Sequence, residues 1–417
     1  MVEAAAEAGL ISNLYKQIKE LRSSATAKEK DTVDAVGHLL ERVQRSTADL
    51  ILRYPDYSTA PQTDAHGKLW LNVYYKQIES YRKSILKRAD EVKKQAAGVA
   101  EGAEAVDEQL VFKTKHNFVR LVAAYTKFLT DAMAFFQDLM LSLEAAATQQ
   151  EHDATTAKSL VKSISKCLVS LGDLARYKES LNEGSNKNYE VAFRYYERSA
   201  FFAPTVGTPQ NGMAVLATYE KSDLVAVYHY CRSVLVSHPF SQGYANLSTL
   251  FGKNEKAYQN VLREMQRDNE ASVLVPTSGS VATLRRLPGG GTVGKQDQKI
   301  KVHFFILQFI RLHASIFDWC ACRFGLLGDV PKAPPQINIE DFTSDVHDML
   351  SHLDEVVTSL SDALLVRLIV ICIYSIHESI PVPTRGEHEE KTVSRNRGPR
   401  TTGESLALII IYGLVNK

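Results

Sequence analysis

The sequence predicts an all-α protein, an α-α superhelix assembled from helical hairpins. The first indication is the spacing of apolar residues, which recur three or four apart along most of the chain, as on one face of a helix. No stretch alternates apolar and polar residues long enough to predict a half-buried strand. A degenerate repeat in the middle of the chain is the third indication, because stacked helical hairpins produce such repeats.

Three helices are predicted most clearly, near residues 11–21, 70–85 and 118–143. Their apolar stripes are Ile11, Leu14, Ile18 and Leu21; Trp70, Tyr74, Ile78, Tyr81 and Ile85; and Phe118, Leu121, Tyr125, Phe128, Phe135 and Leu139. Polar or Gly/Pro-rich segments interrupt the helices. The two most irregular of these, at about 276–299 and 380–403, are predicted to be disordered loops.

Residues 168–239 fit two copies of the tetratricopeptide register, whose period is about 34 residues. In the first copy, Gly172 takes the small-residue position where paired helices cross, and Pro204 ends the second helix. An insertion at about 178–187 separates the two helices. The equivalent pairs in the two copies are Ala192 and Ala226, Tyr196 and Tyr230, and Ser199 and Ser233. We predict a domain boundary shortly after the second copy, which gives domains at 1–250 and 251–417.

Composition predicts a globular protein without a strong overall electric field. The formal net charge is +1, from 49 basic and 48 acidic residues, so nucleic-acid binding would require a local patch. Five cysteines without a C-x-x-C pair fit a reducing compartment. The acidic start does not resemble a signal or transit peptide. Apolar runs at 364–376 and 406–415 fall short of the roughly 20 residues of a membrane span, so no membrane partner is expected.

Two side chains of the repeat region are candidates for ligand binding. Stacked repeats present their first helices along a concave groove, and Arg176 and Asn211 fall on groove-facing positions of the register. A guanidinium can hold an oxyanion with two hydrogen bonds, and an amide can pair with a peptide backbone. Other interpretations stay open: Arg176 could form a salt bridge with Asp173 or Glu179, and Asn211 could cap a helix or join two repeats.

Residues 167–177 of the same region read CLVSLGDLARY. This segment resembles the signature C-L-x-x-L-G-D-[IL]-A-R-Y of the Smg/Est-one family, which comprises the Smg adaptors of nonsense-mediated mRNA decay and the related telomerase subunit Est-one. Further similar segments lie within 69–78, 192–216, 228–247, 309–313 and 371–377. The resemblance extends over nearly the whole chain, and its most specific part is the region 167–247.

The resemblance implies a 14-3-3-like tetratricopeptide domain at 1–250, whose groove binds phosphoserine or phosphothreonine, and a helical-hairpin domain at 251–417. The family's phosphate-binding arginine falls on Arg176, and Tyr177 beside it is a further hydrogen-bond donor. Asn211 would then hold the peptide backbone.

The resemblance also implies a second cation after the Leu69-Trp70 pair, which we assign to Lys76. Some members carry this cation one residue earlier, where the chain has Tyr75. Arg82 and Lys83 are therefore alternatives. An ordinary solvated lysine is the other interpretation of Lys76.

The implied function is phospho-dependent recruitment. The groove would bind a phosphorylated RNA helicase of the Upf kind and bring other decay adaptors to the transcript, in the cytoplasm and with shuttling to the nucleus. The alternatives are a telomerase-associated subunit that binds telomerase RNA or telomeric DNA, and a tetratricopeptide scaffold without phosphate preference. The family's nuclease-bearing members continue into an aspartate-rich domain. We expect this chain to be either an adaptor-type member or a fragment, and the apolar residues 406–412 suggest that more chain follows.

No catalytic residue, cofactor or metal site is predicted. Gly289–Lys295 mimics a phosphate-binding P-loop, but Gln296 stands where Ser or Thr is needed, so a linker is the better interpretation. Cys320 and Cys322, near His313, lack a fourth ligand at zinc-site spacing. The notable basic cluster either contacts nucleic-acid phosphates or is a solvated loop. Its members are Arg385, Arg395, Arg397 and Arg400.

Overall fold

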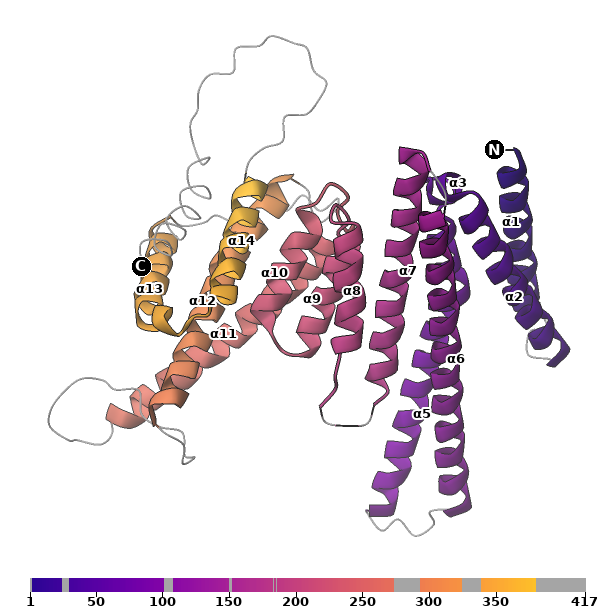
Figure 1. Cartoon of the computed structure of the whole chain (residues 1–417). Helices are drawn as coiled ribbons and strands as arrows, with labels where there is room; N and C mark the ends of the chain where they lie inside the picture. The colour runs from indigo at the N-terminus through magenta and orange to yellow at the C-terminus, as the bar shows by residue number, and fades with distance from the viewer. Residues whose placement is uncertain are drawn as a thin grey trace. The chain divides into compact units, whose positions relative to one another are not determined.

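The structure is a computed structural model, and it describes residues 2–24, 30–100, 108–149, 152–182, 184, 186–273, 293–324 and 339–379. The regular secondary structure in these ranges is helical, α1 to α14 with a π-helix and a 3-10 turn (Figure 1). An isolated parallel bridge between Val206 and His238 is the β-type pairing found among the described residues. The predicted all-α class is therefore confirmed.

The chain divides into two compact units, Met1–Pro204 and Thr205–Lys417. The boundary predicted after Leu250 falls inside a helix, α11 (Gly243–Val273), and not between the units. The reason is packing, because Leu247, Leu250 and Phe251 of α11 are buried in the core that the second unit builds from its other helices. The functional division into 1–250 and 251–417 stays a prediction.

The first unit contains the helices from α1 to α8. They are α1 (Val2–Ser23), α2 (Lys30–Arg53), α3 (Pro55–Thr59), α4 (Ala65–Leu69), the π-helix η1 (Trp70–Tyr75), α5 (Lys76–Ala100), α6 (Glu108–Gln149), α7 (Ala154–Ser180) and α8 (Glu190–Phe202). The long helices α5, α6 and α7 form one packed group, in which α6 contacts both α5 and α7 (Figure 1). The apolar stripes predicted from the sequence supply much of the core, including Ile11, Leu14, Ile18, Tyr74, Ile78 and Tyr125.

The helix that carries the predicted second cation contains a π-helical segment. α4, η1 and α5 follow one another without a break from Ala65 to Ala100. The ring of Tyr74 packs 4.9 Å from that of Phe136, and the ring of Trp70 lies 6.1 Å from the same phenylalanine. A π-helical turn takes more residues than an α-turn, so it changes which way the residues after it face. Lys76 is the first residue after this segment.

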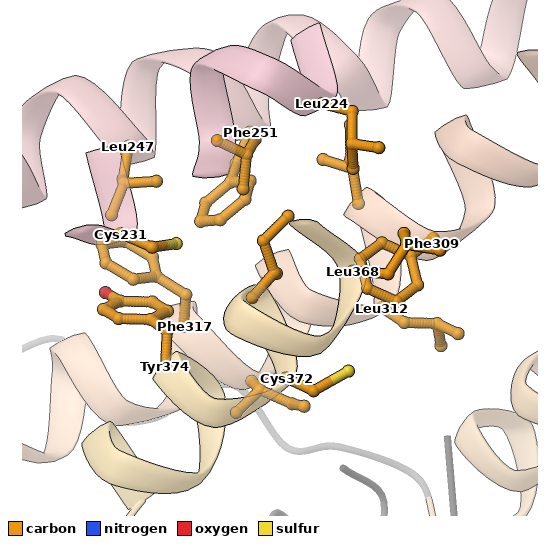
Figure 2. Packing of buried hydrophobic residues seen from close by; sticks show 14 of the residues in the cluster. Leu224, Cys231, Leu247, Phe251, Phe309, Leu312, Phe317, Leu368, Cys372 and Tyr374 are labelled. Carbon is orange, nitrogen blue, oxygen red and sulfur yellow. The ribbon is translucent and has the colours of Figure 1, made fainter. Parts of the chain in front are cut away.

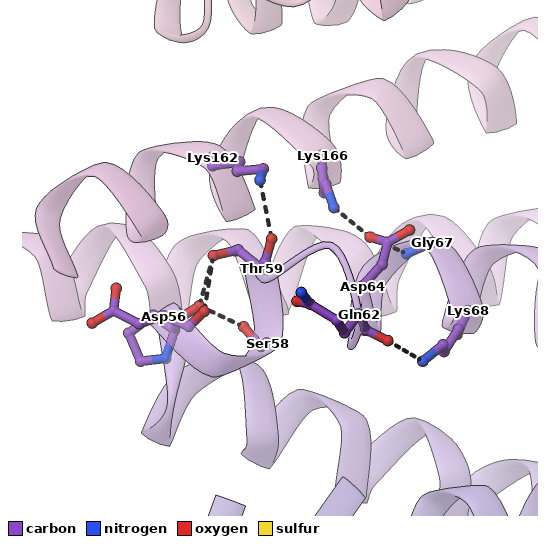
Figure 3. A network of polar contacts seen from close by, with 10 residues as sticks. Asp56, Ser58, Thr59, Gln62, Asp64, Gly67, Lys68, Lys162 and Lys166 are labelled. Atoms are coloured by element: carbon purple, nitrogen blue, oxygen red, sulfur yellow. Dashed lines mark hydrogen bonds and ion pairs between the residues drawn. The ribbon is translucent and has the colours of Figure 1, made fainter. Parts of the chain in front are cut away.

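Two lysines of α7 fix the turn between α3 and α4 (Figure 3). Lys162 Nζ donates to the carbonyl of Thr59 at 3.0 Å, and Lys166 Nζ pairs with the carboxylate of Asp64 at 2.5 Å. Asp64 has a left-handed backbone, φ 34°, and its side chain caps α4 by accepting from the N–H of Gly67. A Cβ on Gly67 would lie 2.0 Å from that carboxylate, so a larger residue here would displace the Asp64 side chain from its contacts. These contacts anchor α7, the helix that carries Arg176.

The first predicted repeat is the hairpin of α7 and α8. A Cβ added to Gly172 would lie 2.6 Å from Cε1 of Tyr196, so the two helices cross as closely as the register predicts. The hydroxyls of Ser165 and Ser199 lie 2.8 Å apart in the same buried crossing. Both serines therefore satisfy their polar groups across the hairpin.

The second unit begins with the other predicted repeat, the hairpin of α9 (Thr208–Tyr219) and α10 (Asp223–Val234). A Cβ on Gly207 would lie 1.9 Å from the backbone carbonyl of Ser233, which requires glycine at this position. After α11 come α12 (Val293–Phe324), α13 (Ile339–Val356), η2 (Val357–Ser359) and α14 (Asp362–Ser379). Leu224, Phe251, Phe309, Phe317 and Leu368 are among the buried residues of the shared core (Figure 2).

The predicted loops lie mostly outside the described residues. Residues 293–299 of the first loop form the opening turns of α12, so the prediction was wrong there. The Gln298 side chain is held by the Glu355 carbonyl at 3.1 Å and the Ser359 hydroxyl at 2.9 Å, which are tertiary contacts. Residues 276–292 and 380–403, the basic arginine cluster and the apolar run 406–415 lie outside the described ranges.

One segment of the described chain, Gln298–Asp318 in α12, is long and apolar enough to cross a membrane. However, 56% of its apolar window is buried inside the structure, and Phe305, Phe309 and Ile310 belong to the core of the second unit. A helix buried in a protein core can be as long and as apolar as a membrane span, and α12 is such a core helix. The shorter run predicted at 364–376 lies in α14, where Leu368 and Ile371 are buried.

Candidate functional site

Arg176 lies near the C-terminal end of α7, between a carboxylate and two aromatic residues. Its Nη2 donates to Oδ1 of Asp173 at 2.9 Å, and its Nε lies 3.4 Å from the hydroxyl of Tyr196. The guanidinium carbon is 4.3 Å from the centre of the Tyr177 ring, which is cation–π geometry. The side chains of Arg176 and Asp173 are 12% and 24% exposed. The cation is therefore held in one place at the edge of the core.

Asp173 is shared between two donors. The Tyr196 hydroxyl donates to Oδ1 at 2.6 Å, and this oxygen also receives the Arg176 bond. Glu179, the other carboxylate considered from the sequence, accepts instead from Asn182 Nδ2 at 3.2 Å and from the backbone N–H of Asn188 at 2.7 Å. The salt bridge left open by the sequence is thus formed with Asp173.

The surroundings fix the protonation states of Arg176 and Tyr177. Burial lowers the pKa of Arg176, but Asp173, Tyr196 and Tyr177 outweigh burial and raise it above its usual value. Burial raises the pKa of the Tyr177 hydroxyl, although the nearby Arg176 acts in the opposite direction. At neutral pH the site therefore presents a permanent cation beside a protonated phenol, and both groups can donate hydrogen bonds to an oxyanion.

A second cation reaches the same aromatic ring from α5. The guanidinium carbon of Arg82 lies 5.5 Å from the centre of the Tyr177 ring. Its Nη1 pairs with Glu79 at 2.5 Å, and the Arg82 side chain is 47% exposed. Burial lowers the pKa of Arg82, and Glu79 raises it by more. The structure thus brings Arg82 and Arg176 to one ring from two helices.

Lys76 does not belong to the group formed by Arg82, Arg176 and Tyr177. Its Nζ donates to Oδ1 of Asn72 at 2.7 Å, and the side chain lines a pocket of about 460 Å³ together with residues of α1. That pocket includes neither Arg176 nor Tyr177. Lys76 and Arg82 are six residues apart on α5, which separates them by about 9 Å along the axis and about 120° around it. The assignment of Lys76 to the phosphate site stays a prediction.

Asn211 belongs to the second unit, where it lies in the first turn of α9, which begins at Thr208. Its Oδ1 accepts from Nδ2 of Asn246 on α11 at 2.8 Å. The amide therefore joins two helices, as one of the sequence interpretations proposed. This bond uses the Asn211 carbonyl and one Asn246 N–H, so the Asn211 N–H₂ and the Asn246 carbonyl are the groups that could pair with a peptide backbone. A role for Asn211 in peptide binding remains a prediction.

The buried histidines do not form a metal site in the described part of the chain, where no group of three or more His, Cys, Asp or Glu residues is arranged to bind a metal ion. His313 is buried, its Nδ1 lies 2.6 Å from the Ser375 hydroxyl, and its Nε2 lies 3.7 Å from the sulfur of Cys372. Burial lowers the pKa of His313 to about 3, so the ring is neutral.

Sequence reasoning missed two partners of the site. Tyr196 was assigned only to packing, although it also holds Asp173 from the neighbouring helix. Asn246 was not assigned at all. The spacing of Asp173 three residues before Arg176 was a usable signal, because such residues face each other on a helix. No signal in the sequence indicates that Asn246 meets Asn211.

Comparison with known proteins identifies the family. The family described as "Est1 DNA/RNA binding domain" matches residues 192–411, and "Telomerase activating protein Est1" matches residues 64–182. Because the first match alone includes more than half of the chain, the chain belongs to the Est1 family. The predicted Smg/Est-one resemblance is therefore confirmed.

Individual relatives agree with this assignment. "Nonsense-mediated mRNA decay factor SMG7" of Arabidopsis thaliana is 24% identical over 409 residues, 92% of this chain and 36% of that protein. "Telomerase-binding protein EST1A" of Danio rerio is 26% identical over 246 residues, 57% of this chain and 15% of that protein. The chain thus spans about a third or less of these relatives. A solved structure, "Crystal structure of Est1 and Cdc13", has the same fold with a TM-score of 0.54 at 12% identity, covering 98% of this chain and 70% of that one.

Proposed function

We propose that the chain is a non-enzymatic adaptor that binds peptides carrying phosphoserine or phosphothreonine. The observation that carries the proposal is the convergence of Arg82 and Arg176 on the ring of Tyr177. Two guanidinium groups around one ring, together with its phenol O–H, supply donors of the kind that bind a phosphate group. In nonsense-mediated mRNA decay, the ligand would be a phosphorylated RNA helicase of the Upf kind, and other decay adaptors would be recruited with it.

The two arginines have different parts in this proposal. Asp173 and Tyr196 fix the guanidinium plane of Arg176 before a ligand arrives, which lowers the entropy cost of binding. Arg82 is the adaptable partner, because its exposed ion pair with Glu79 contributes only about 0–1 kcal/mol. A phosphate dianion offers stronger charge-assisted hydrogen bonds than one exposed carboxylate, so Arg82 would exchange Glu79 for the ligand.

The relatives support a role in nonsense-mediated mRNA decay, but they do not indicate that the ligand is a phosphopeptide. The name of the SMG7 relative places that protein in nonsense-mediated mRNA decay, which favours the same pathway for this chain. Their presence in one family with Est1 also supports a telomerase link. A location in the cytoplasm with shuttling to the nucleus would fit both roles.

The proposal is tested by calorimetric titration of the whole chain with a Ser-Gln peptide, phosphorylated or not. We expect only the phosphorylated form to bind, and we expect Arg176→Glu and Arg82→Glu each to weaken it by about tenfold to a hundredfold. Lys76→Glu tests the assignment made from the resemblance, and Lys87→Glu, an exposed lysine of α5, is the matched control. Equal affinity for both peptide forms would exclude phospho-recognition.

A second candidate function is nucleic-acid binding, favoured by the family description of residues 192–411 as a DNA/RNA-binding domain. Telomerase RNA or telomeric DNA would be the ligand. Salt separates the two functions, because contacts with many phosphates release many counterions and lose affinity steeply with salt. A single peptide phosphate should give a shallow slope. Titrations of a telomeric-repeat oligonucleotide and of the phosphopeptide at several salt concentrations therefore distinguish them.

A further inference from the structure

A second cationic feature lies in the first unit, in a pocket of about 460 Å³ between α1 and the start of α5. We call it the α1–α5 pocket. Its basic lining residues are Lys16, Lys19 and Arg22 of α1 and Lys76 of α5. Ser12 and Ser23 also line it, and the Ser23 hydroxyl donates to the Glu20 carbonyl at 3.0 Å. The pocket thus gathers four cations.

The sequence spacing and one hydrogen bond arrange these cations. Lys16, Lys19 and Arg22 follow one another at intervals of three residues on α1, so they occupy an arc of about 120° around the helix, and all three line the pocket. Asn72, one turn before Lys76, holds the lysine side chain. The Lys76 Nζ donates to Oδ1 of Asn72 at 2.7 Å, and Nδ2 of Asn72 donates to the Lys68 carbonyl at 3.0 Å. The charge of Lys76 is therefore positioned by η1, independently of α1.

The α1–α5 pocket lacks the acidic partners that the Tyr177 site contains. No carboxylate is among its lining residues, and no ion pair within 4.0 Å involves its four cations in the described part of the chain. Partial burial lowers the pKa of Arg22, and no acidic neighbour offsets this effect. At the Tyr177 site, by contrast, Asp173 and Glu79 pair with the arginines. Unpaired like charges gathered in a concave site attract anions.

We propose that the α1–α5 pocket binds a compact polyphosphate, a ligand with two or more adjacent phosphoryl groups. Four cations match an anion of charge about −3 to −5, whereas one phosphoserine carries only about −2. Arg22 can hold a phosphoryl group with two hydrogen bonds, and the lysines serve as point charges. The volume lies within the range of small-molecule sites, about 300–1,000 Å³. This site is separate from the Tyr177 site of the proposed function.

The test is calorimetric titration of the whole chain at low salt with three probes that share this chemistry: inorganic triphosphate, a nucleoside triphosphate and inositol hexakisphosphate. The pocket variant is Lys19→Glu with Arg22→Glu, and its matched control is Lys87→Glu with Lys94→Glu, two exposed lysines of α5. We expect the pocket variant to weaken binding of at least one probe by about tenfold or more, and the control by less than about twofold. Circular dichroism verifies that both variants are folded.

The probes also distinguish the sources of the ligand. Preference for the nucleoside triphosphate over inorganic triphosphate would indicate a nucleotide, and preference for inositol hexakisphosphate would indicate an inositol phosphate. Arg176→Glu should leave probe binding unchanged, so failure of the phosphopeptide proposal does not affect this result. Absence of binding for all three probes at about millimolar concentration, or equal losses in pocket and control variants, would overturn the proposal. The proposal would also be overturned if the singly phosphorylated peptide bound more tightly than all three probes and lost this affinity in the pocket variant.

Discussion

The hydroxyl of Tyr196 on α8 donates to Oδ1 of Asp173 on α7 at 2.6 Å, and Arg176 donates to the same oxygen at 2.9 Å. One carboxylate oxygen therefore links the helix crossing of the first repeat to the proposed phosphate site. Burial and Asp173 raise the pKa of Tyr196 well above its usual value, so the phenol keeps its proton. The stability of the hairpin and the position of the cation depend on the same contact.

Tyr196→Phe should test that link. The ring remains to fill the crossing against Gly172, but the Asp173 oxygen loses a buried donor. We expect the free energy of unfolding to fall by about 1.5–3 kcal/mol, the range for hydrogen bonds to charged groups. Urea unfolding measures it. The control is Tyr195→Phe, whose hydroxyl accepts from Gln137 Nε2 at 3.1 Å, a bond between neutral groups. An equal loss in both variants would show that the charge of Asp173 is not involved.

Phosphopeptide affinity should depend on pH through the ligand. The pKa values of Arg82 and Arg176 are both raised, so neither guanidinium changes charge below pH 10. The second ionisation of a phosphoserine has a pKa of about 6, so the dianion is lost as the pH falls below that value. We expect affinity to rise between pH 5 and 7.5 and then to level off. Titrations at three pH values measure this. A peptide with glutamate in place of phosphoserine is the control, and a flat profile for the phosphopeptide would contradict the proposed contacts.

Gly172→Ala should destabilise the α7–α8 hairpin. The added methyl would lie 2.6 Å from Cε1 of Tyr196, in a crossing where the ring is fully buried. Overpacking of this kind costs about 1–3 kcal/mol, which exceeds the helix-propensity gain of about 1 kcal/mol for replacing glycine. Gly37→Ala in α2 is the matched control, because nothing lies within 4 Å of its added methyl, and it should stabilise the protein. Thermal unfolding compares the two variants, and a stabilised Gly172→Ala would refute the close crossing.

His66 should make the first unit sensitive to acid. Burial, reinforced by Lys166, lowers the pKa of His66 to about 3. The unfolded state binds a proton near pH 6.5, so this stability is complete above pH 6.5 and is lost as the pH falls towards 3. Between pH 6.5 and 5 the loss should be about 2 kcal/mol. His66→Leu should remove that pH dependence, whereas His38→Leu, at an exposed position, should keep it.

The acid sensitivity can be measured in the first unit alone. The chain has two tryptophans, Trp70 and Trp319, and only Trp70 belongs to the first unit. In a Trp319→Phe background, urea unfolding followed by fluorescence therefore reports the unit that contains His66. Parallel pH profiles for His66→Leu and the parent would show that another group causes the acid sensitivity.

Much of the fold follows from local patterns in the sequence. Ile11, Leu14 and Ile18 are buried as their spacing predicts, because apolar residues three and four apart share one face of a helix. Gly172 lies at the close helix crossing that the repeat register predicts, since this position lacks space for a Cβ. The signature that contains Arg176 is also local, and it was sufficient to identify the family.

The tertiary structure alone determined which cations share a site. Lys76 and Arg82 lie on one helix, and their sequence does not tell which of them faces Tyr177 of α7. The direction of each depends on the π-helical segment before them and on how α5 packs beside its neighbours. The same holds for the α1–α5 pocket, whose cations come from helices far apart in the sequence. Helix periodicity is a property of neighbouring residues, whereas a binding site is built from the contacts between helices.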